Sequence, residues 1–304
     1  SAQEQYYNGV DLNAEGLALK ENLATKTINA HTNFLDYTWE ASRITDLDPN
    51  DSNNVLLIYG WENGSDGDVT NDLSRSKNNN GGGQGDWNRE HTFANSLAIP
   101  KLDDSGRNGT SFSDAHNLRA SDVQRNGLRG NMLFAAGSGN SGAVGSNWYP
   151  GDATAGGTDW RGDVARVTMY MYLRYGSQCL PRYNASGNIN STDPEMIDVL
   201  LDWNAADPVS DYEDARNTYH ESTSSYAQGN RNPFIDNPYL ATRIWGGTPA
   251  EDRWGIYTSN DNEAPTTPTN VTLSNSSPSS IDVSWSASSD NVAVTAYEIY
   301  VDGS

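Results

Sequence analysis

The chain has 304 residues, which is enough for two domains or for one large domain followed by a fragment. Its 40 acidic and 19 basic residues give a formal net charge of -21, and such a surface disfavours unselective binding to polyanions. No apolar run approaches the roughly 18 residues of a membrane-spanning helix, so we expect no membrane partner. The single cysteine, Cys179, excludes an internal disulfide.

The first 60 residues are predicted to form helix and then a short strand. Four leucines and Ile28 recur with roughly helical spacing from residue 12 to residue 28, and residues 55–59 form a short apolar run typical of a strand. Residues 46–54 lie between them and are dense in turn formers. Their carboxylates could bind calcium, but a solvated turn is the simpler interpretation.

Two polar, glycine-containing loops are expected at residues 61–86 and 137–157. Helices are predicted beyond the second loop, from apolar spacing and from flanking proline and glycine, at residues 163–175, 194–203, 212–218 and 238–245.

The pattern changes near the C-terminus. Residues 258–263 are predicted to be a linker between a first domain, residues 1–257, and a second, residues 264–304. The second contains short stretches of alternating polar and apolar residues, which favour strands. A β-sandwich of the immunoglobulin type needs about 100 residues, so we expect an incomplete sheet here.

The charge is uneven along the chain. Residues 73–131 contain eight basic and six acidic residues, whereas the remainder contains 11 basic and 34 acidic residues. The difference could arise by chance in an acidic protein. Alternatively, it indicates a local surface that binds a phosphate backbone.

Two segments concentrate side chains suited to phosphodiester hydrolysis: WNREHTFANS at residues 87–96 and DAHNLRASDVQRNGLRGN at residues 114–131. That reaction needs a base for water, a hard cation with oxygen ligands, and arginine to hold the phosphate. Glu90, His91, Asn117 and several arginines meet these needs, whereas structural zinc would require clustered Cys and His.

Glu90 and His91 are neighbours in the chain. Successive side chains of a regular strand point to opposite faces. The two residues can therefore serve one site only at a strand end, at a bulge, or with the cation to one side of the strand.

The two segments resemble the signature segments of the bacterial endonuclease I family. Members of that family are periplasmic or secreted nonspecific nucleases of the ββα-metal class. GDVAR at 162–166 and GNRNPFIDNP at 229–238 extend the similarity to roughly residues 5–247. Residues 264–304 resemble the first half of a fibronectin type III domain. The resemblance implies an α+β fold, with a ββα-metal (His-Me finger) core surrounded by helices and long loops and with an incomplete fibronectin-like sandwich behind it.

The resemblance also implies roles for individual residues. His91 is expected to be the general base, and Glu90 and Asn117 are expected to bind a divalent cation, with Mg²⁺ as the expected ion and Mn²⁺ or Ca²⁺ as alternatives. Arg107, between the two segments, is the candidate for contact with the scissile phosphate, and Arg129 is a second catalytic candidate. Further candidates for substrate contacts are His116, Arg119 and Arg166. A purely structural role is the alternative for these arginines.

The sequence thus predicts a secreted endonuclease, extracellular or periplasmic before export. It is expected to act as a monomer and to hydrolyse DNA, and also RNA, to 5′-phosphate products by contacting the phosphate backbone. The alternative is a glycan-binding or adhesive extracellular protein, which the many aromatic and Asn residues would suit. A glycosidase with paired carboxylates would not explain the Glu-His and His-Asn segments.

Overall fold

The computed structural model describes residues 5–103, 111–257, 264–289, 297 and 299–300. The chain divides into two compact units, Ser1–Arg253 and Trp254–Ser304. The predicted linker at residues 258–263 lies outside the described residues. Within the described ranges, no helix has both the length and the apolar character needed to cross a membrane.

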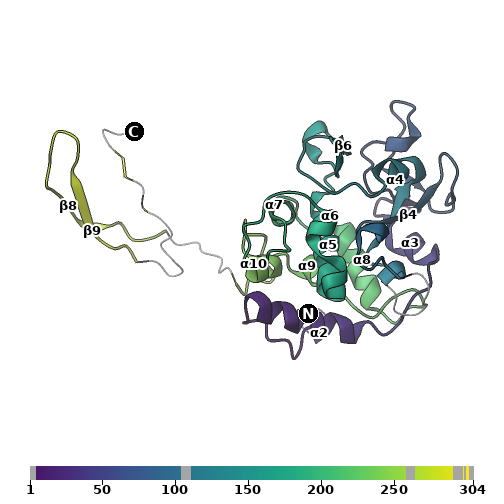
Figure 1. Ribbon diagram of the computed structural model, residues 1–304, viewed down its shortest axis with the longest axis horizontal. Coiled ribbons are helices and arrows are strands. Elements are labelled where there is room, and N and C mark those ends of the chain that lie inside the picture. Colours follow the sequence, from purple (N-terminus) through teal and green to yellow (C-terminus); the bar gives the residue numbers. More distant parts are fainter. Residues whose placement is uncertain (1–4, 104–110, 258–263, 290–296, 298, 301–304) are drawn as a thin grey trace. The chain divides into compact units, whose positions relative to one another are not determined.

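Helices make up much of the first unit, and α5 runs through its middle (Figure 1). The helices are α2 (Gly16–Ala30), α3 (Glu40–Thr45), α4 (Val123–Arg129), α5 (Arg161–Tyr175), α6 (Pro181–Asn184), α7 (Asp198–Ala206), α8 (Asp211–Glu221), α9 (Pro233–Asp236) and α10 (Tyr239–Trp245). The α5 residues from Gly162 to Leu173 are all buried, because α2, α7 and α9 pack around this helix. The helix predicted at residues 163–175 is therefore the central element of the unit.

The helix predicted at residues 194–203 differs in the structure, where α7 begins only at Asp198. The Asp193 carboxylate accepts hydrogen bonds from the Tyr172 hydroxyl group and from the Trp245 indole N–H, each at 3.0 Å. Ile197, at the helix N-cap, has extended backbone angles. Tertiary contacts thus fix the start of this segment outside the helix.

A three-stranded antiparallel sheet contains β1 (Leu47–Asp48), β2 (Asp51–Leu56) and β3 (Ser74–Ser76) in that order. The turn predicted at residues 46–54 is therefore largely a hairpin, and β2 begins four residues before the predicted strand. The chain stays buried through Tyr59 after β2 ends, and Ile58 N–H donates to the Ala120 carbonyl (2.8 Å). This bond joins the three-stranded sheet to the strands that carry the candidate site.

Those strands are β4 (Trp87–His91) and β5 (Leu118–Asp122), which form a two-stranded antiparallel sheet. α4 begins at the residue after β5, so the order is strand, strand, helix. A third sheet pairs β6 (Gly142–Val144) with β7 (Asn147–Tyr149).

The described residues of the second unit form one antiparallel pair, β8 (Thr269–Ser274) and β9 (Asp282–Ser286). Val271 and Leu273 on β8 are 58% and 64% exposed. A strand pair with apolar side chains open to solvent lacks the second layer that would make it a sandwich.

Candidate active site

The candidate site is built on β4, β5 and α4. The two strands pair in unbroken register from Trp87↔Asp122 to His91↔Leu118. The Asp122 carboxylate accepts a hydrogen bond from the backbone N–H of Arg125 (2.9 Å) and so caps the first turn of α4. Because α4 packs back against both strands, residues from the two signature segments lie in one strand–strand–helix unit.

Glu90 lies in β4 and is only 3% exposed. Its Oε1 atom accepts hydrogen bonds from the Tyr59 hydroxyl group (2.8 Å) and from Arg129 Nη1 (2.9 Å). Burial raises the pKa of Glu90, and the interactions with Arg129 and Tyr59 act in the opposite direction. Oε2 makes no hydrogen bond with any residue that the structure describes. The carboxylate is thus held by one oxygen while the other is left for a ligand.

His91 is the last residue of β4, so of the three arrangements left open by the sequence the structure has the strand end. Its ring stacks on Tyr37 at 5.6 Å, and its Nε2 atom lies 2.7 Å from the Phe112 carbonyl oxygen. A carbonyl only accepts hydrogen bonds, so Nε2 carries the proton and Nδ1 keeps its lone pair. Burial lowers the pKa of His91 to about 4, so the imidazole is neutral at neutral pH. A neutral imidazole is the form that can accept a proton.

Arg129 ends α4 and is fully buried. Besides Glu90, its guanidinium donates to the carbonyls of His91 (3.1 Å) and Thr92 (3.2 Å) and to Asn184 Oδ1 (3.1 Å). All these acceptors belong to the site or to its support. The structure therefore places Arg129 as the group that holds Glu90 and the end of β4, rather than as an exposed contact for substrate.

Asn117, the amide ligand expected from the sequence, precedes β5 and is fully buried. Its Oδ1 atom accepts from the Phe93 backbone N–H (2.7 Å) and its Nδ2 atom donates to the Phe93 carbonyl (3.1 Å). The amide thus extends the pairing between the two strands. Because Asn117 is fully buried and its Oδ1 atom already accepts from Phe93, it is less well placed to bind a cation than an amide with an unbonded oxygen.

Asn126 on α4 offers a second amide, which the sequence analysis passed over. Its Nδ2 atom donates to Asn88 Oδ1 (2.7 Å), and its Oδ1 atom makes no hydrogen bond with a described residue. Asn88 is two residues before Glu90 and shares its face of β4. Asn126 is three residues before Arg129 and shares its face of α4. The spacing from Arg129 was the available sequence signal for this residue.

Arg89 was also missed, although the alternation of β4 places it on the same face as His91. Its guanidinium lies 3.7 Å from the ring centres of both Tyr37 and Trp39. It donates to the Tyr37 carbonyl (2.9 Å) and is half-buried. The Arg89 guanidinium, held between the Tyr37 and Trp39 rings on the His91 face of β4, is suited to contact a phosphate.

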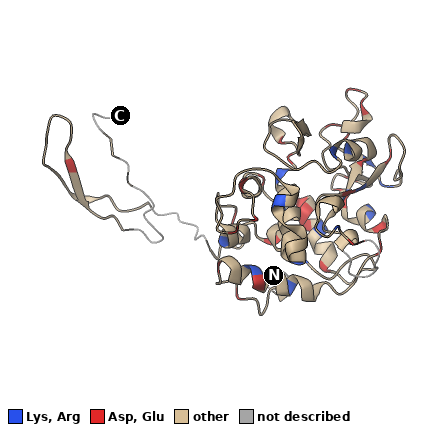
Figure 2. Cartoon of the chain, in the orientation of Figure 1, with Lys and Arg blue, Asp and Glu red and all other residues tan. Residues whose placement is uncertain are grey.

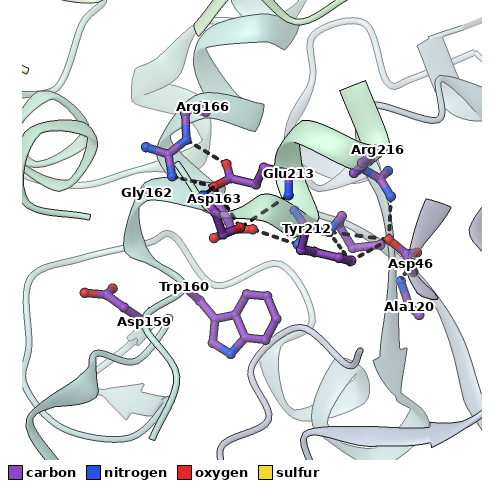
Figure 3. Close-up of polar contacts among 12 residues, drawn as sticks. Asp46, Ala120, Asp159, Trp160, Gly162, Asp163, Arg166, Tyr212, Glu213 and Arg216 are labelled. Atoms are coloured by element: carbon purple, nitrogen blue, oxygen red, sulfur yellow. Dashed lines mark hydrogen bonds and ion pairs between the residues drawn. The ribbon is translucent and has the colours of Figure 1, made fainter. Parts of the chain in front are cut away.

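Figure 3 shows a buried polar network that includes Asp163, Arg166 and Glu213. Arg119 pairs with Asp163, so the network joins β5 to α5 and α8. Arg119 donates to Asp163 Oδ1 (2.7 Å). Arg166 is fully buried and donates hydrogen bonds to both carboxylate oxygens of Glu213, at 2.7 and 2.9 Å. Neither guanidinium can reach a substrate without breaking these pairs, so the geometry disfavours the expected substrate contacts and favours the structural alternative.

His116 is buried as well, with Nε2 3.1 Å from the Asn230 carbonyl oxygen and its ring 4.6 Å from that of Tyr170. The structure gives it no open path to substrate. Arg107 lies outside the described residues.

Many of the basic side chains at residues 73–131 are buried, so the stretch does not form a continuous basic surface. Its buried members are Arg75, Arg119, Arg125 and Arg129. Figure 2 shows basic residues spread over the first unit rather than gathered on one element. Much of the positive charge in this stretch therefore compensates buried carboxylates and carbonyls, and Arg89 is a half-buried exception beside the site.

The oxygen atoms at the site suit a hard divalent cation. The described residues hold no cluster of three or more His, Cys, Asp or Glu side chains placed to bind a metal ion. A centre here would use one carboxylate, Glu90, with amide oxygen and water. Mg²⁺ is bound in this way, through one or two carboxylates and several retained waters, whereas zinc prefers Cys and His.

A buried carboxylate with a free oxygen beside a neutral imidazole indicates an enzyme active site rather than an adhesive surface. Comparison with known proteins gives the kind of enzyme. Residues 15–239 match the family model described as Endonuclease I, so the chain belongs to the endonuclease I family and is a nuclease. This confirms the family expected from the signature segments.

The relatives agree. An extracellular ribonuclease of Bacillus subtilis (strain 168) is 41% identical over 248 residues, which cover 80% of this chain and 78% of that protein. An extracellular ribonuclease of Bacillus amyloliquefaciens is 39% identical over 251 residues, with the same coverage of 80% and 78%. A short match of 40 residues at 52% identity links 13% of this chain to 6% of chitinase A1 of Niallia circulans.

Proposed function

We propose that this chain is a secreted, divalent-metal-dependent endonuclease that cleaves RNA and DNA without sequence preference and leaves 5′ phosphates. The names of the two extracellular ribonucleases support RNA as a substrate and support secretion, to the exterior or to the periplasm before export. Membership of the endonuclease I family supports endonucleolytic cleavage. Activity on DNA and the monomeric state rest on the sequence resemblance.

One observation carries the proposal. The neutral His91 ring, with Nε2 bound to the Phe112 carbonyl, lies next in the chain to Glu90, whose Oε2 atom is free of described partners. A base and an oxygen ligand are thus fixed at the end of one strand. The arrangement supports a ββα-metal site, for which β4, β5 and α4 would supply the two strands and the helix.

The mechanism follows from these atoms. When bound, a divalent cation such as Mg²⁺ neutralises charge on the phosphate and on the departing 3′ oxygen. His91 Nδ1 accepts a proton from the water that attacks phosphorus in line. The bond from Nε2 to the Phe112 carbonyl keeps the ring oriented and stabilises the imidazolium that forms. Tyr59 and Arg129 hold Glu90 Oε1, so that Oε2 is fixed for cation binding.

For the second ligand we propose Asn126 in place of Asn117. Asn126 is half-buried, lies on the α4 face that meets Glu90, and has its Oδ1 atom free of described partners. Asn117 uses both atoms of its amide on Phe93. Water would complete the coordination in either arrangement.

Substrate is proposed to bind through its phosphates, which explains cleavage without sequence preference. Arg89 is the contact that the described residues support, since it lies on the His91 face of β4. Arg107 remains the sequence-based candidate for the scissile phosphate. The second unit is proposed to be part of a fibronectin type III-like spacer or adhesion module, outside the chemistry.

The test is cleavage of plasmid DNA and of RNA by the full chain, with and without EDTA, for the wild type and for His91→Ala. We expect EDTA to abolish cleavage and the variant to be about 10²–10⁴ times slower. Circular dichroism melting curves serve as the control for folding. Cleavage that persists in EDTA, or a fully active and folded His91→Ala, would overturn the mechanism.

A further inference from the structure

A second group of oxygen ligands lies outside the active site, in the loop formed by residues 62–72, here called the acidic loop. Its two ends are tied together, because the Asn71 carbonyl accepts from the backbone N–H groups of Trp61 (2.9 Å) and Glu62 (3.3 Å). Asp72 Oδ1 also accepts from the Gly64 N–H (3.1 Å). The chain therefore folds back on itself and brings Glu62 beside Asn71.

Asp66 joins these two side chains. Asn71 Nδ2 donates to Asp66 Oδ2 (2.8 Å). The pKa of Asp66 lies below its ordinary value, first because the Asp68 N–H donates to it, then because of the Asn71 amide, and also because the Glu62 carboxyl group lies within hydrogen-bonding reach. Three oxygen-bearing side chains, Glu62, Asp66 and Asn71, thus meet in one place.

Two of the oxygen atoms in this group lack a partner. Asn71 is 3% exposed, and its Oδ1 atom is buried without a hydrogen bond. Glu62 Oε1 is likewise buried and unbonded, whereas Oε2 accepts from the backbone N–H (2.9 Å) and the hydroxyl group of Ser65. A buried acceptor without a donor is costly, so each such atom in a native structure calls for an explanation.

The nearby protein cations do not supply that partner. Arg75 is paired with Asp122 (2.7 Å) and donates to the Val69 carbonyl. Arg125 donates from Nε to the Thr70 carbonyl (3.1 Å) and lies over the Trp61 ring at 4.4 Å. Both guanidinium groups thus bind the backbone of the acidic loop and leave its two unbonded oxygens without a positive charge.

We propose that Glu62, Asp66 and Asn71 bind one Ca²⁺ ion, at a site distinct from the catalytic centre. Ca²⁺ accepts six to eight oxygen ligands in flexible geometry, from carboxylates, amide oxygens, carbonyls and water. Mg²⁺ requires a near-ideal octahedron, and zinc requires His or Cys, which the acidic loop lacks. The inference does not depend on the catalytic mechanism.

The acidic loop also supports the catalytic helix. Within it, the 3-10 turn η1 (Val69–Asn71) packs against α4, and Arg125 of α4 is held by the Thr70 carbonyl and the Trp61 ring. An ion that fixes Asn71 therefore fixes the surface on which α4 lies. The bound ion is a structural one, and its occupancy raises the stability of the first unit.

The experiment is calcium titration of the metal-stripped full chain by calorimetry, with melting curves in parallel. Glu90→Gln removes the candidate catalytic ligand and should keep calcium binding at wild-type affinity. Glu62→Gln and Asp66→Asn should each weaken it about tenfold or more. Asp66 is exposed, so its variant tests the site even if Glu62→Gln fails to fold. Asp51→Asn, at the exposed start of β2, is the control for loss of one carboxylate and should bind calcium as the wild type does.

At a calcium concentration about 100 times Kd, the wild type and Glu90→Gln should melt roughly 5–10 °C higher than without calcium. Asp66→Asn at the same concentration should show about half this shift or less. Mg²⁺ should bind the acidic loop at least about tenfold more weakly. Loss of calcium binding in Glu90→Gln, equal affinity for Mg²⁺, or wild-type binding by both acidic-loop variants would overturn the proposal.

Discussion

Two of the buried groups of arginine–carboxylate pairs in the first unit differ in which carboxylate oxygens they leave unbonded. In the network of Figure 3, Arg166 binds both oxygens of Glu213, and Arg119 binds Asp163. In the candidate site, Arg129 and Tyr59 bind only Oε1 of Glu90. Both groups follow the rule that buried charges are paired.

The number of unbonded carboxylate oxygens distinguishes a structural ion pair from a candidate catalytic one. The Arg166–Glu213 pair, in which both carboxylate oxygens are bonded, joins α5 to α8 and has no carboxylate atom left for a ligand. A carboxylate held on one side, beside an imidazole with a free Nδ1, is supported and still available. Arginine at a sequence motif is therefore a weaker sign of substrate contact than an unbonded atom on a fixed side chain.

The strongest way to test this comparison is to remove the half-bonded carboxylate. Glu90→Gln should lower cleavage at least about a hundredfold, since cation stabilisation of the transition state is worth several kcal/mol. The variant should also need a higher Mg²⁺ concentration for half-maximal rate. Rates measured against Mg²⁺, at a temperature where circular dichroism shows a folded chain, check both effects. Wild-type activity would remove Glu90 from the site.

The matching change in the saturated network should do the opposite. Arg166→Met leaves Glu213 buried without its cation, and we expect a loss of about 3–5 kcal/mol in the free energy of unfolding. Urea unfolding measures this. The folded fraction should keep its rate per molecule, and a stable but inactive variant would place Arg166 in the chemistry after all.

The two asparagines sharpen the comparison at the level of single amides. Asn126→Ala should raise the Mg²⁺ concentration for half-maximal rate about 10–100-fold with little change in stability. Asn117→Ala leaves the Phe93 N–H and carbonyl without partners, and should lose about 1–3 kcal/mol of stability instead. Parallel rate and urea measurements on both variants decide which amide binds the cation. The reverse pattern would restore Asn117 as the ligand.

The sequence allowed Glu90 and His91 to be proposed as a pair, because they lie in a distinctive segment, and a strand end was one of the three arrangements in which strand neighbours could serve one site. It could not rank Asn117 against Asn126, since the contact that engages Asn117 comes from the Phe93 backbone, which is 24 residues away. Nor could it reveal that Arg119 and Arg166 are paired with carboxylates 44 and 47 residues further along the chain. Local patterns specify elements, whereas burial and pairing depend on the packing of distant segments.

The start of α7 and the unbonded oxygens of the acidic loop give the same lesson. Proline and acidic residues at 194–198 favour a helix start, yet side chains from α5 and α10 fix Asp193 and delay the helix to Asp198. Glu62 and Asn71 are unremarkable in a polar loop. Only the folded chain shows that each has an oxygen buried without a donor.

The smallest expected effect concerns pH. Burial, together with the nearby Asp163 carboxylate, raises the pKa of Asp207 to about 8. Its carboxyl Oδ2 atom accepts from the Gly162 N–H (2.8 Å), at the start of α5. A raised folded-state pKa means that the folded chain holds a proton which the unfolded chain has lost. This contribution to stability is therefore complete below about pH 4 and is lost as pH rises towards 8.

Asp207→Asn keeps an oxygen for the Gly162 N–H but cannot ionise. Relative to the wild type, its melting temperature should rise by a few degrees between pH 7 and pH 8. Melting curves at both pH values check this, and Asp202→Asn, on the α7 surface, is the control that should show no such trend. If the wild type instead gained stability relative to Asp207→Asn as pH rises, Asp207 would be ionised in the folded chain. The network around Arg166 would then hold one more buried negative charge than its arginine–carboxylate pairs account for.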